Sequence, residues 1–196
     1  MRRLLAVILA TSISAAAPVT AQGEANTRRA GLWLTAGGGE ARNRVDCDNC
    51  GEIERYWGGT GFLRAGGTLS DRVRVGGETY SWQRSFESSA SYVRGLQGII
   101  LWYPAFPARG FFVQSGLGLA RLRSEFERNG SRVQAAATGM SVMLGLGYEV
   151  RLRGRIWVTP MVSSTAVPTA TIDTPNGTLE NVVGTLLQFG LGVTWD

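Results

Sequence analysis

The chain has 196 residues, with 20 basic residues that are all arginine, 15 acidic residues, 27 glycines and no histidine. Glycine is about twice its ordinary usage and charged residues fall below the usual quarter, which excludes disordered and coiled-coil proteins. Without histidine, Ser-His-Asp hydrolysis, Cys-His nucleophiles and His-ligated metal sites are excluded. The length and composition predict one all-β domain with many tight bends.

The N-terminal segment has the three regions of a secretory signal peptide. Two arginines precede an apolar stretch over residues 4–17, and small residues lead up to Ala21. The apolar run is shorter than the roughly 20 residues of an uncleaved membrane anchor. We therefore expect residues 1–21 to be removed, leaving 22–196 as the single mature domain.

Beyond residue 22, apolar residues recur at every second position, which is the periodicity of strands. The clearest runs are Val142–Leu152 and Leu187–Trp195, each with one apolar face and one face of glycine and polar residues. Several runs reach the roughly ten residues that a tilted strand needs to cross a membrane. The eight predicted strands cover residues 30–39, 60–69, 73–82, 91–103, 111–122, 139–152, 156–163 and 182–195.

The connections between these runs alternate in length. Short connections are expected at 70–72, 104–109 and 153–155, and long ones at 40–59, 83–90, 123–138 and 164–181. Asn129-Gly130 and Asn176-Gly177 mark tight turns at two long-loop tips. This pattern predicts an eight-stranded antiparallel up-and-down transmembrane β-barrel, with long loops extracellular and both termini periplasmic.

Aromatic residues gather near both sets of connections, as rings anchored at two lipid–water interfaces would. Beside the short turns lie Trp102, Tyr103, Phe106, Phe111, Phe112, Trp157 and Trp195. Beside the long loops lie Tyr56, Trp57, Tyr80, Trp82, Phe86 and Tyr92. We expect two aromatic belts on the outer surface.

The other face of the strands suits a crowded lumen, because side chains just fill an eight-stranded barrel. Small residues there are Gly66, Gly76, Gly118, Gly145, Gly147, Gly190 and Gly192. A charge buried among them needs a partner. The polar network predicted to plug the lumen comprises Arg64, Arg74, Glu78, Gln114, Glu149, Arg151 and Gln188.

Alternation alone leaves two other barrels open. With every face reversed, the chain would form a soluble periplasmic lipocalin-like barrel that binds a small hydrophobic ligand. Gly31-Leu32-Trp33 matches the short Gly-x-Trp pattern of that fold. With an incompletely filled lumen, the chain would form a narrow outer-membrane pore.

The sequence resembles the small bacterial outer-membrane β-barrels of the OmpA transmembrane-domain and OmpX kind, in the porin-like superfamily. The resemblance rests on the turn over 68–73, Trp102-Tyr103-Pro104, the strand over 145–148 and the final strand over 187–195. It implies a structural or surface-interaction role, with outer-membrane lipid and the barrel-assembly machinery as partners. Such barrels usually end on an aromatic residue, whereas here Asp196 follows Trp195.

Cys47 and Cys50 are the two cysteines of the chain. In an exported protein a disulfide between them is the leading interpretation. A redox Cys-x-x-Cys motif would open a helix, and a zinc site would need two more soft ligands. We therefore expect no metal and no cofactor.

Arginines gather at the long-loop end, where guanidinium groups can bind lipopolysaccharide phosphates. The candidates are Arg42, Arg44, Arg55, Arg84, Arg94, Arg121 and Arg123, with Arg128 and Arg132 nearby. The competing interpretation is a solvated face balanced by Glu87, Glu125 and Glu127. The formal net charge of +5 does not demand a nucleic-acid partner.

Catalysis is not expected. Outer-membrane enzymes of this architecture use a histidine in their catalytic sets, as the resemblance implies, and this chain has none. Glu125 and Glu127 share a strand face, but the pattern supplies them with no partner acid.

Overall fold

A computed structural model describes residues 31–46, 48, 55–86, 89–105, 110–128, 131–174 and 177–196. Its strands are β1 (Leu32–Asp46), β2 (Tyr56–Ser70), β3 (Val73–Phe86), β4 (Ser89–Trp102), β5 (Phe111–Arg128), β6 (Ser131–Tyr148), β7 (Val150–Arg153), β8 (Ile156–Thr174) and β9 (Gly177–Trp195). Over these residues we find no helix long and apolar enough to cross a membrane. The predicted signal peptide over 1–21 lies outside the described residues.

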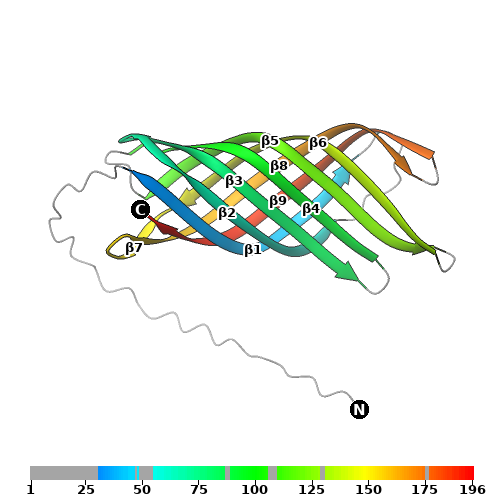
Figure 1. Ribbon diagram of the computed structural model, residues 1–196, viewed down its shortest axis with the longest axis horizontal. Coiled ribbons are helices and arrows are strands. Elements are labelled where there is room, and N and C mark those ends of the chain that lie inside the picture. The colour runs from blue at the N-terminus through cyan, green and yellow to red at the C-terminus, as the bar shows by residue number, and fades with distance from the viewer. Residues whose placement is uncertain are drawn as a thin grey trace, which may run out of the picture.

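The strands close into an antiparallel barrel (Figure 1). Strands that follow one another in sequence pair with each other, except β6 and β7; β1 also pairs with β9, and β6 pairs with β8. The short β7 continues β6, because Val150 pairs with Val158 in the register that joins Gly147 to Met161. The predicted all-β, eight-stranded up-and-down barrel is confirmed, with β6 and β7 together forming its sixth strand.

One end of the barrel carries both ends of the described chain and the connections between β2 and β3, β4 and β5, and β7 and β8. There Thr68 N donates to Gly31 O at 3.1 Å, and Asp196 N donates to Arg155 O at 3.2 Å. Gly154, with φ of 57°, takes the left-handed conformation in the turn before β8. We call this the short-turn end.

At the opposite end the strands run further than predicted. β5 ends at Arg128 and β6 begins at Ser131, so residues 123–138, predicted as a long loop, belong largely to a paired hairpin. The predicted loops at 83–90 and 164–181 are likewise mostly strand. Alternation missed these extensions, because backbone hydrogen bonds continue where apolar and polar residues no longer alternate regularly.

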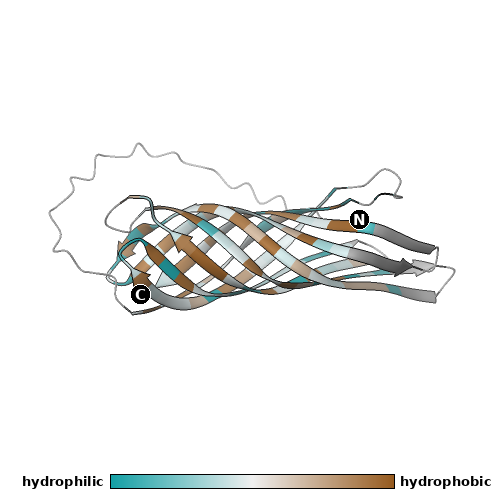
Figure 2. Ribbon diagram, turned by 90° about the horizontal axis from the view of Figure 1, so that it is seen from above, coloured by the Kyte–Doolittle hydropathy of each residue, from teal (hydrophilic) through white to brown (hydrophobic). Residues whose placement is uncertain are grey.

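The apolar face of the strands points outward. Val142, Leu144 and Leu146 on β6 are exposed, and the exposed fraction of Leu144 is 64 %. Figure 2 shows hydrophobic positions that follow one another across the strands. The transmembrane interpretation requires this orientation. The soluble lipocalin-like alternative requires the opposite one, with the apolar residues lining a cavity.

The interior holds two clusters of buried hydrophobic side chains. The cluster near the short-turn end comprises Trp33, Ile99, Leu101, Tyr103, Phe112 and Met143. The other comprises Ala41, Phe62, Tyr80, Trp82, Val93, Ala120, Met161, Val167 and Leu186. The lumen is therefore partly apolar, where the sequence predicted a glycine and polar interior.

Interior glycines make room for these rings. A Cβ on Gly147 would lie 2.7 Å from Cε1 of Phe112, and one on Gly66 would lie 2.7 Å from Cζ2 of Trp33. Gly95 lies against the ring of Tyr80 in the same way. Each of these glycines therefore leaves the space that an aromatic side chain of a neighbouring strand occupies.

The two predicted aromatic belts are only partly correct. Trp102, Phe111 and Trp195 are exposed near the short turns, and Tyr56 and Trp57 are exposed at the other end. Tyr80, Trp82, Tyr103, Phe112 and Trp157 are instead buried inside the barrel. In a strand, adjacent aromatics such as Trp102 and Tyr103 point to opposite faces, so clustering in sequence could not place them all outside. Phe106 and the side chain of Phe86 lie outside the described residues.

Candidate functional site

A chain of buried polar side chains runs along the inner face of three adjacent strands, from β2 to β4. Arg64 pairs with Glu78, its direct neighbour in the register, and Gln97 Nε2 donates to Glu78 Oε1 at 2.7 Å. Arg64 and Glu78 are 2 % and 4 % exposed. Both carboxylate oxygens of Glu78 therefore contact side chains of the two neighbouring strands. Arg64 and Gln97 are its direct partners in the antiparallel register.

Other buried polar groups extend this network. Gln114 Nε2 contacts Met143 Sδ at 3.0 Å, and Ser141 Oγ donates to Gln97 Oε1 at 3.5 Å. Gln188 is buried on β9. Arg64 Nη2, Gln114 Oε1 and Gln188 Nε2 have no hydrogen-bond partner among the described residues. The network is therefore not fully paired. Each buried polar atom without a hydrogen bond lowers the stability of the folded state by about 1–3 kcal/mol.

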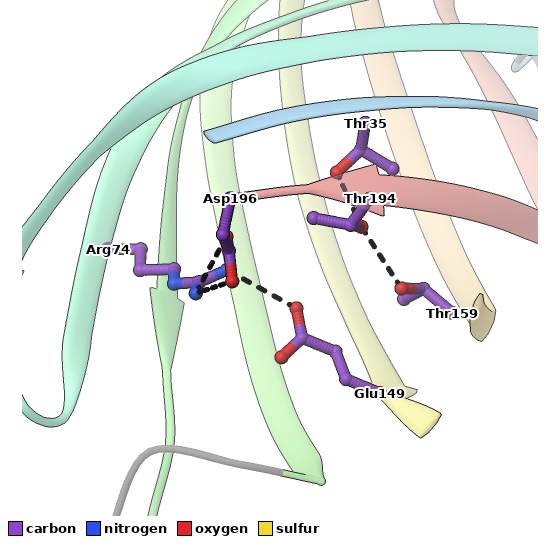
Figure 3. A network of polar contacts seen from close by, with 6 residues as sticks. All are labelled: Thr35, Arg74, Glu149, Thr159, Thr194 and Asp196. Atoms are coloured by element: carbon purple, nitrogen blue, oxygen red, sulfur yellow. Dashed lines mark hydrogen bonds and ion pairs between the residues drawn. The ribbon is translucent and has the colours of Figure 1, made fainter. Parts of the chain in front are cut away.

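A second set of charges lies at the short-turn end (Figure 3). Arg74 lies 3.4 Å from Glu149 Oε1 and 3.0 Å from Asp196 Oδ1, measured from its two terminal nitrogens. Its guanidinium also lies 5.5 Å from the centroid of the Tyr103 ring. Arg74 is only 1 % exposed, and two carboxylates together with an aromatic face replace the water it has lost.

Threonine hydroxyls join three strands beside these charges. Thr194 Oγ1 on β9 lies 2.8 Å from Thr35 Oγ1 on β1 and 3.2 Å from Thr159 Oγ1 on β8 (Figure 3). All three side chains are buried. The ladder spans the junction of the first and last strands, and so supports the closure of the barrel at this end.

The structure places six of the seven predicted lumen residues inside the barrel, with Arg151 as the exception. Arg151 is exposed on β7, and its Nε donates to Gly154 O at 3.2 Å. By alternation it faces the same side as Glu149. However, among the described strands β7 pairs only with β8, and it extends past Phe111, the first residue of β5, so Arg151 lies beyond the described wall.

The predicted polar network left out three side chains that contact its charges and amides: Gln97 and Ser141, which are buried, and Asp196, which is partly buried. Gln97 and Ser141 lie at inward positions of predicted strands, so their alternation with Leu96 and Val142 was a usable signal. Asp196 follows the last strand, and its contact with Arg74 across the barrel end carries no local signature in the sequence.

The predicted arginine set separates into several places. Arg44 lies 2.5 Å from Asp46 Oδ1 in an exposed ion pair, and the Arg84 guanidinium lies 3.9 Å from the centroid of the Tyr56 ring. Arg42 is half-buried and Arg55 is exposed. The side chains of Arg128 and Arg132 lie outside the described residues.

Arg94, Arg121 and Arg123 are brought together on the outer face of β4 and β5. Arg94 is directly opposite Arg121, and Tyr92 is directly opposite Arg123. With Tyr92 and Glu125, the three arginines line a surface pocket of about 310 Å³. Arg123 Nη2 pairs with Glu125 Oε1 at 2.7 Å.

The predicted disulfide lies outside the described residues, whereas the expected absence of a metal site concerns them in part. Cys47 and Cys50 are not described, so their pairing stays a prediction. Over the described residues, no group of three or more His, Cys, Asp or Glu side chains is arranged to hold a metal ion.

Comparisons with known proteins identify the fold. No protein-family model and no curated protein sequence matches this chain. The crystal structure of Ail, the attachment invasion locus protein of Yersinia pestis, is similar with a TM-score of 0.61 and 13 % sequence identity over 85 % of this chain and 99 % of Ail. Neisserial surface protein A is similar with a TM-score of 0.54 and 13 % identity over 84 % of this chain and 96 % of its own. The chain has the fold of the small outer-membrane β-barrels, as its sequence resemblance predicted.

Proposed function

We propose that this chain is an integral outer-membrane β-barrel that acts through its structure or its surface, and that neither transports bulk solutes nor catalyses a reaction. The observation that carries the proposal is the outward apolar face. Leu96, Leu117 and Leu119 are more than half exposed, with Leu144 and Leu191. Monomeric soluble proteins rarely expose a contiguous apolar surface of this kind, whereas a bilayer covers it.

The buried side chains support a plugged lumen. The buried pair of Arg64 and Glu78 lies inside the lumen between the two apolar clusters. Arg74, held by Glu149 and Asp196, closes the short-turn end. Side chains packed in this way favour a lumen without an open path for bulk solutes.

In the proposed orientation the short-turn end faces the periplasm and the extended hairpins face outward. Short periplasmic turns and long extracellular extensions are the usual arrangement of outer-membrane barrels. The barrel-assembly machinery would insert the chain, and outer-membrane lipid would surround it.

Cell fractionation combined with gel electrophoresis of unboiled and boiled samples tests the proposal. We expect the protein in the outer-membrane fraction, with an unboiled band that migrates differently from the boiled one. Recovery in the soluble periplasmic fraction without a heat-dependent shift would contradict the membrane assignment and favour the lipocalin-like barrel.

A narrow pore is the second candidate, favoured by the buried polar atoms Arg64 Nη2 and Gln188 Nε2 that have no partner among the described residues. Single-channel recording in planar bilayers separates the two. The plugged lumen predicts conductance at background level, and discrete openings well above background would establish the pore instead.

A further inference from the structure

The outer surface of β4 and β5, next to β6, changes from apolar to cationic within one step of the strand register. Leu96, Leu119 and Met140 are direct neighbours across these strands, and they are exposed to 69 %, 60 % and 55 %. The next outward-facing positions toward the extended hairpins are Arg94 and Arg121. Two residues of a strand span about 7 Å, so the guanidinium groups begin directly above the apolar surface.

Over the part of the chain that the structure describes, no carboxylate balances the charges of Arg94 and Arg121. Arg94 and Arg121 face each other across the register, and like charges directly opposite one another destabilise a sheet. Glu125 pairs with Arg123. Among the described side chains, neither Arg94 nor Arg121 has a carboxylate within ion-pairing distance. An anion between these two guanidinium groups would turn a repulsive arrangement into an attractive one.

The size of the adjoining pocket limits what that anion can be. Its volume of about 310 Å³ is at the lower end of ligand pockets, which run from roughly 300 to 1,000 Å³. It can hold a phosphate and part of the sugar that carries it. Acyl chains attached to that sugar would lie on the exposed surface of Leu96 and Leu119, outside the pocket.

We propose that Arg94, Arg121 and Arg123 form a binding site for the phosphates of lipopolysaccharide in the outer leaflet. Planar guanidinium groups bind phosphate oxygens bidentately, and three of them lie where an apolar, lipid-facing surface ends. Tyr92 stands beside Arg123 at the edge of the site. This inference rests on the proposed outer-membrane location. It names lipopolysaccharide as a lipid that binds to the outer surface of the barrel.

The test uses the full barrel in phosphatidylcholine nanodiscs or detergent micelles and measures binding of a bisphosphorylated lipid A. The variant is R94Q/R121Q. The control is R42Q/R44Q on β1, which removes the same charge from two arginines of the predicted set that lie outside the pocket. We expect R94Q/R121Q to weaken binding at least ten-fold and the control to weaken it less than two-fold. Equal losses in both variants, or no loss in either, would overturn the site.

Two further arms identify the source of the phosphate. A dephosphorylated lipid A with the same acyl chains should bind wild type and R94Q/R121Q alike. Inorganic phosphate should compete only at concentrations far above those of the lipid. If inorganic phosphate binds as tightly as the lipid and depends equally on Arg94 and Arg121, the site takes free phosphate and the lipid assignment is wrong.

The heat-dependent gel shift separates this inference from the proposed function. Variants that keep the shift are folded, so a loss of lipid binding in them reports on the site. A wild-type protein without the shift would refute the membrane barrel. A wild-type shift accompanied by lipid binding that is insensitive to R94Q/R121Q would refute the lipid site alone.

Discussion

At the scale of single residues, Glu78 holds together the polar network inside the lumen. It forms an ion pair with Arg64 on one side and accepts a hydrogen bond from the side-chain amide of Gln97 on the other. Replacing Glu78 with leucine leaves a buried guanidinium without its carboxylate, which costs about 3–5 kcal/mol. We expect a loss of this size in the free energy of unfolding, measured by urea titration in lipid vesicles with tryptophan fluorescence.

The double variant R64L/E78L is the control for that measurement. With both charges removed, no unpaired ion remains, and apolar replacements of a buried pair are often neutral. The double variant should therefore recover most of the stability lost by E78L. A double variant as unstable as E78L would show that packing volume, and not the unpaired charge, determines the cost.

Arg74 differs from Arg64 because two carboxylates share it. Glu149 and Asp196 both lie within ion-pairing distance, so E149Q and D196N should each be tolerated with a loss of about 1 kcal/mol. The variant E149Q/D196N removes both negative charges and should cost more than the sum of the two single changes. Urea unfolding of the four proteins in one double-mutant cycle measures this coupling. Strict additivity would contradict a shared role.

At the scale of strands, aromatic rings of one strand rest on glycines of the next. Phe112 on β5 covers Gly147 on β6, where an added Cβ would approach ring carbons to 2.7 Å and 2.9 Å. We expect G147A to destabilise the barrel by about 1–3 kcal/mol through overpacking. Midpoints of urea unfolding and the heat-dependent gel shift would measure the effect.

Two variants show whether the ring is the cause. F112L should reduce the penalty of G147A, because the smaller side chain can move away from the new methyl group. G59A on β2 should be close to neutral, since no atom lies within 4 Å of a Cβ built there. A large loss in G59A would indicate that glycine is needed for backbone reasons unrelated to the rings.

At the scale of the whole molecule, the outward apolar face predicts a depth-dependent cost for charge. Leu144 and Leu152 are exposed to 64 % and 63 %, but Leu144 lies midway along the apolar face of β6, whereas Leu152 lies on β7 near the turn before β8. In a bilayer, L144R should cost about 2–4 kcal/mol and L152R about 0–1 kcal/mol. Urea unfolding in lipid vesicles distinguishes the two, and equal effects would contradict a membrane-spanning wall.

Much of the architecture was predictable, because period-two alternation reports directly which residues share a face of a strand. The runs at Val142–Leu152 and Leu187–Trp195 belong to observed strands, and their apolar residues point outward. The extension of β5 to Arg128 was not predictable from alternation. It depends on backbone pairing with β6, which does not require a regular alternation of apolar and polar side chains.

In the lumen, too, alternation predicted some features and not others. That Arg64, Glu78 and Gln188 face inward follows from alternation, and so does the need to pair buried charges. Which residue pairs with which does not follow, because partners such as Arg74 and Asp196 are far apart in the chain and meet only when β9 closes against β1. Likewise, alternation places Arg94 and Arg121 outward, but only the register sets them opposite each other.

The sequence by itself therefore determined the class of protein: an all-β chain with alternating faces and long strands, since local periodicity and composition encode these properties. Tertiary structure alone decided three things: that rings such as Phe112 fill the lumen, that Arg151 lies beyond the wall, and that Arg94, Arg121 and Arg123 form one cluster. Each depends on strand register and barrel closure, which are set by the sum of many contacts distant in sequence.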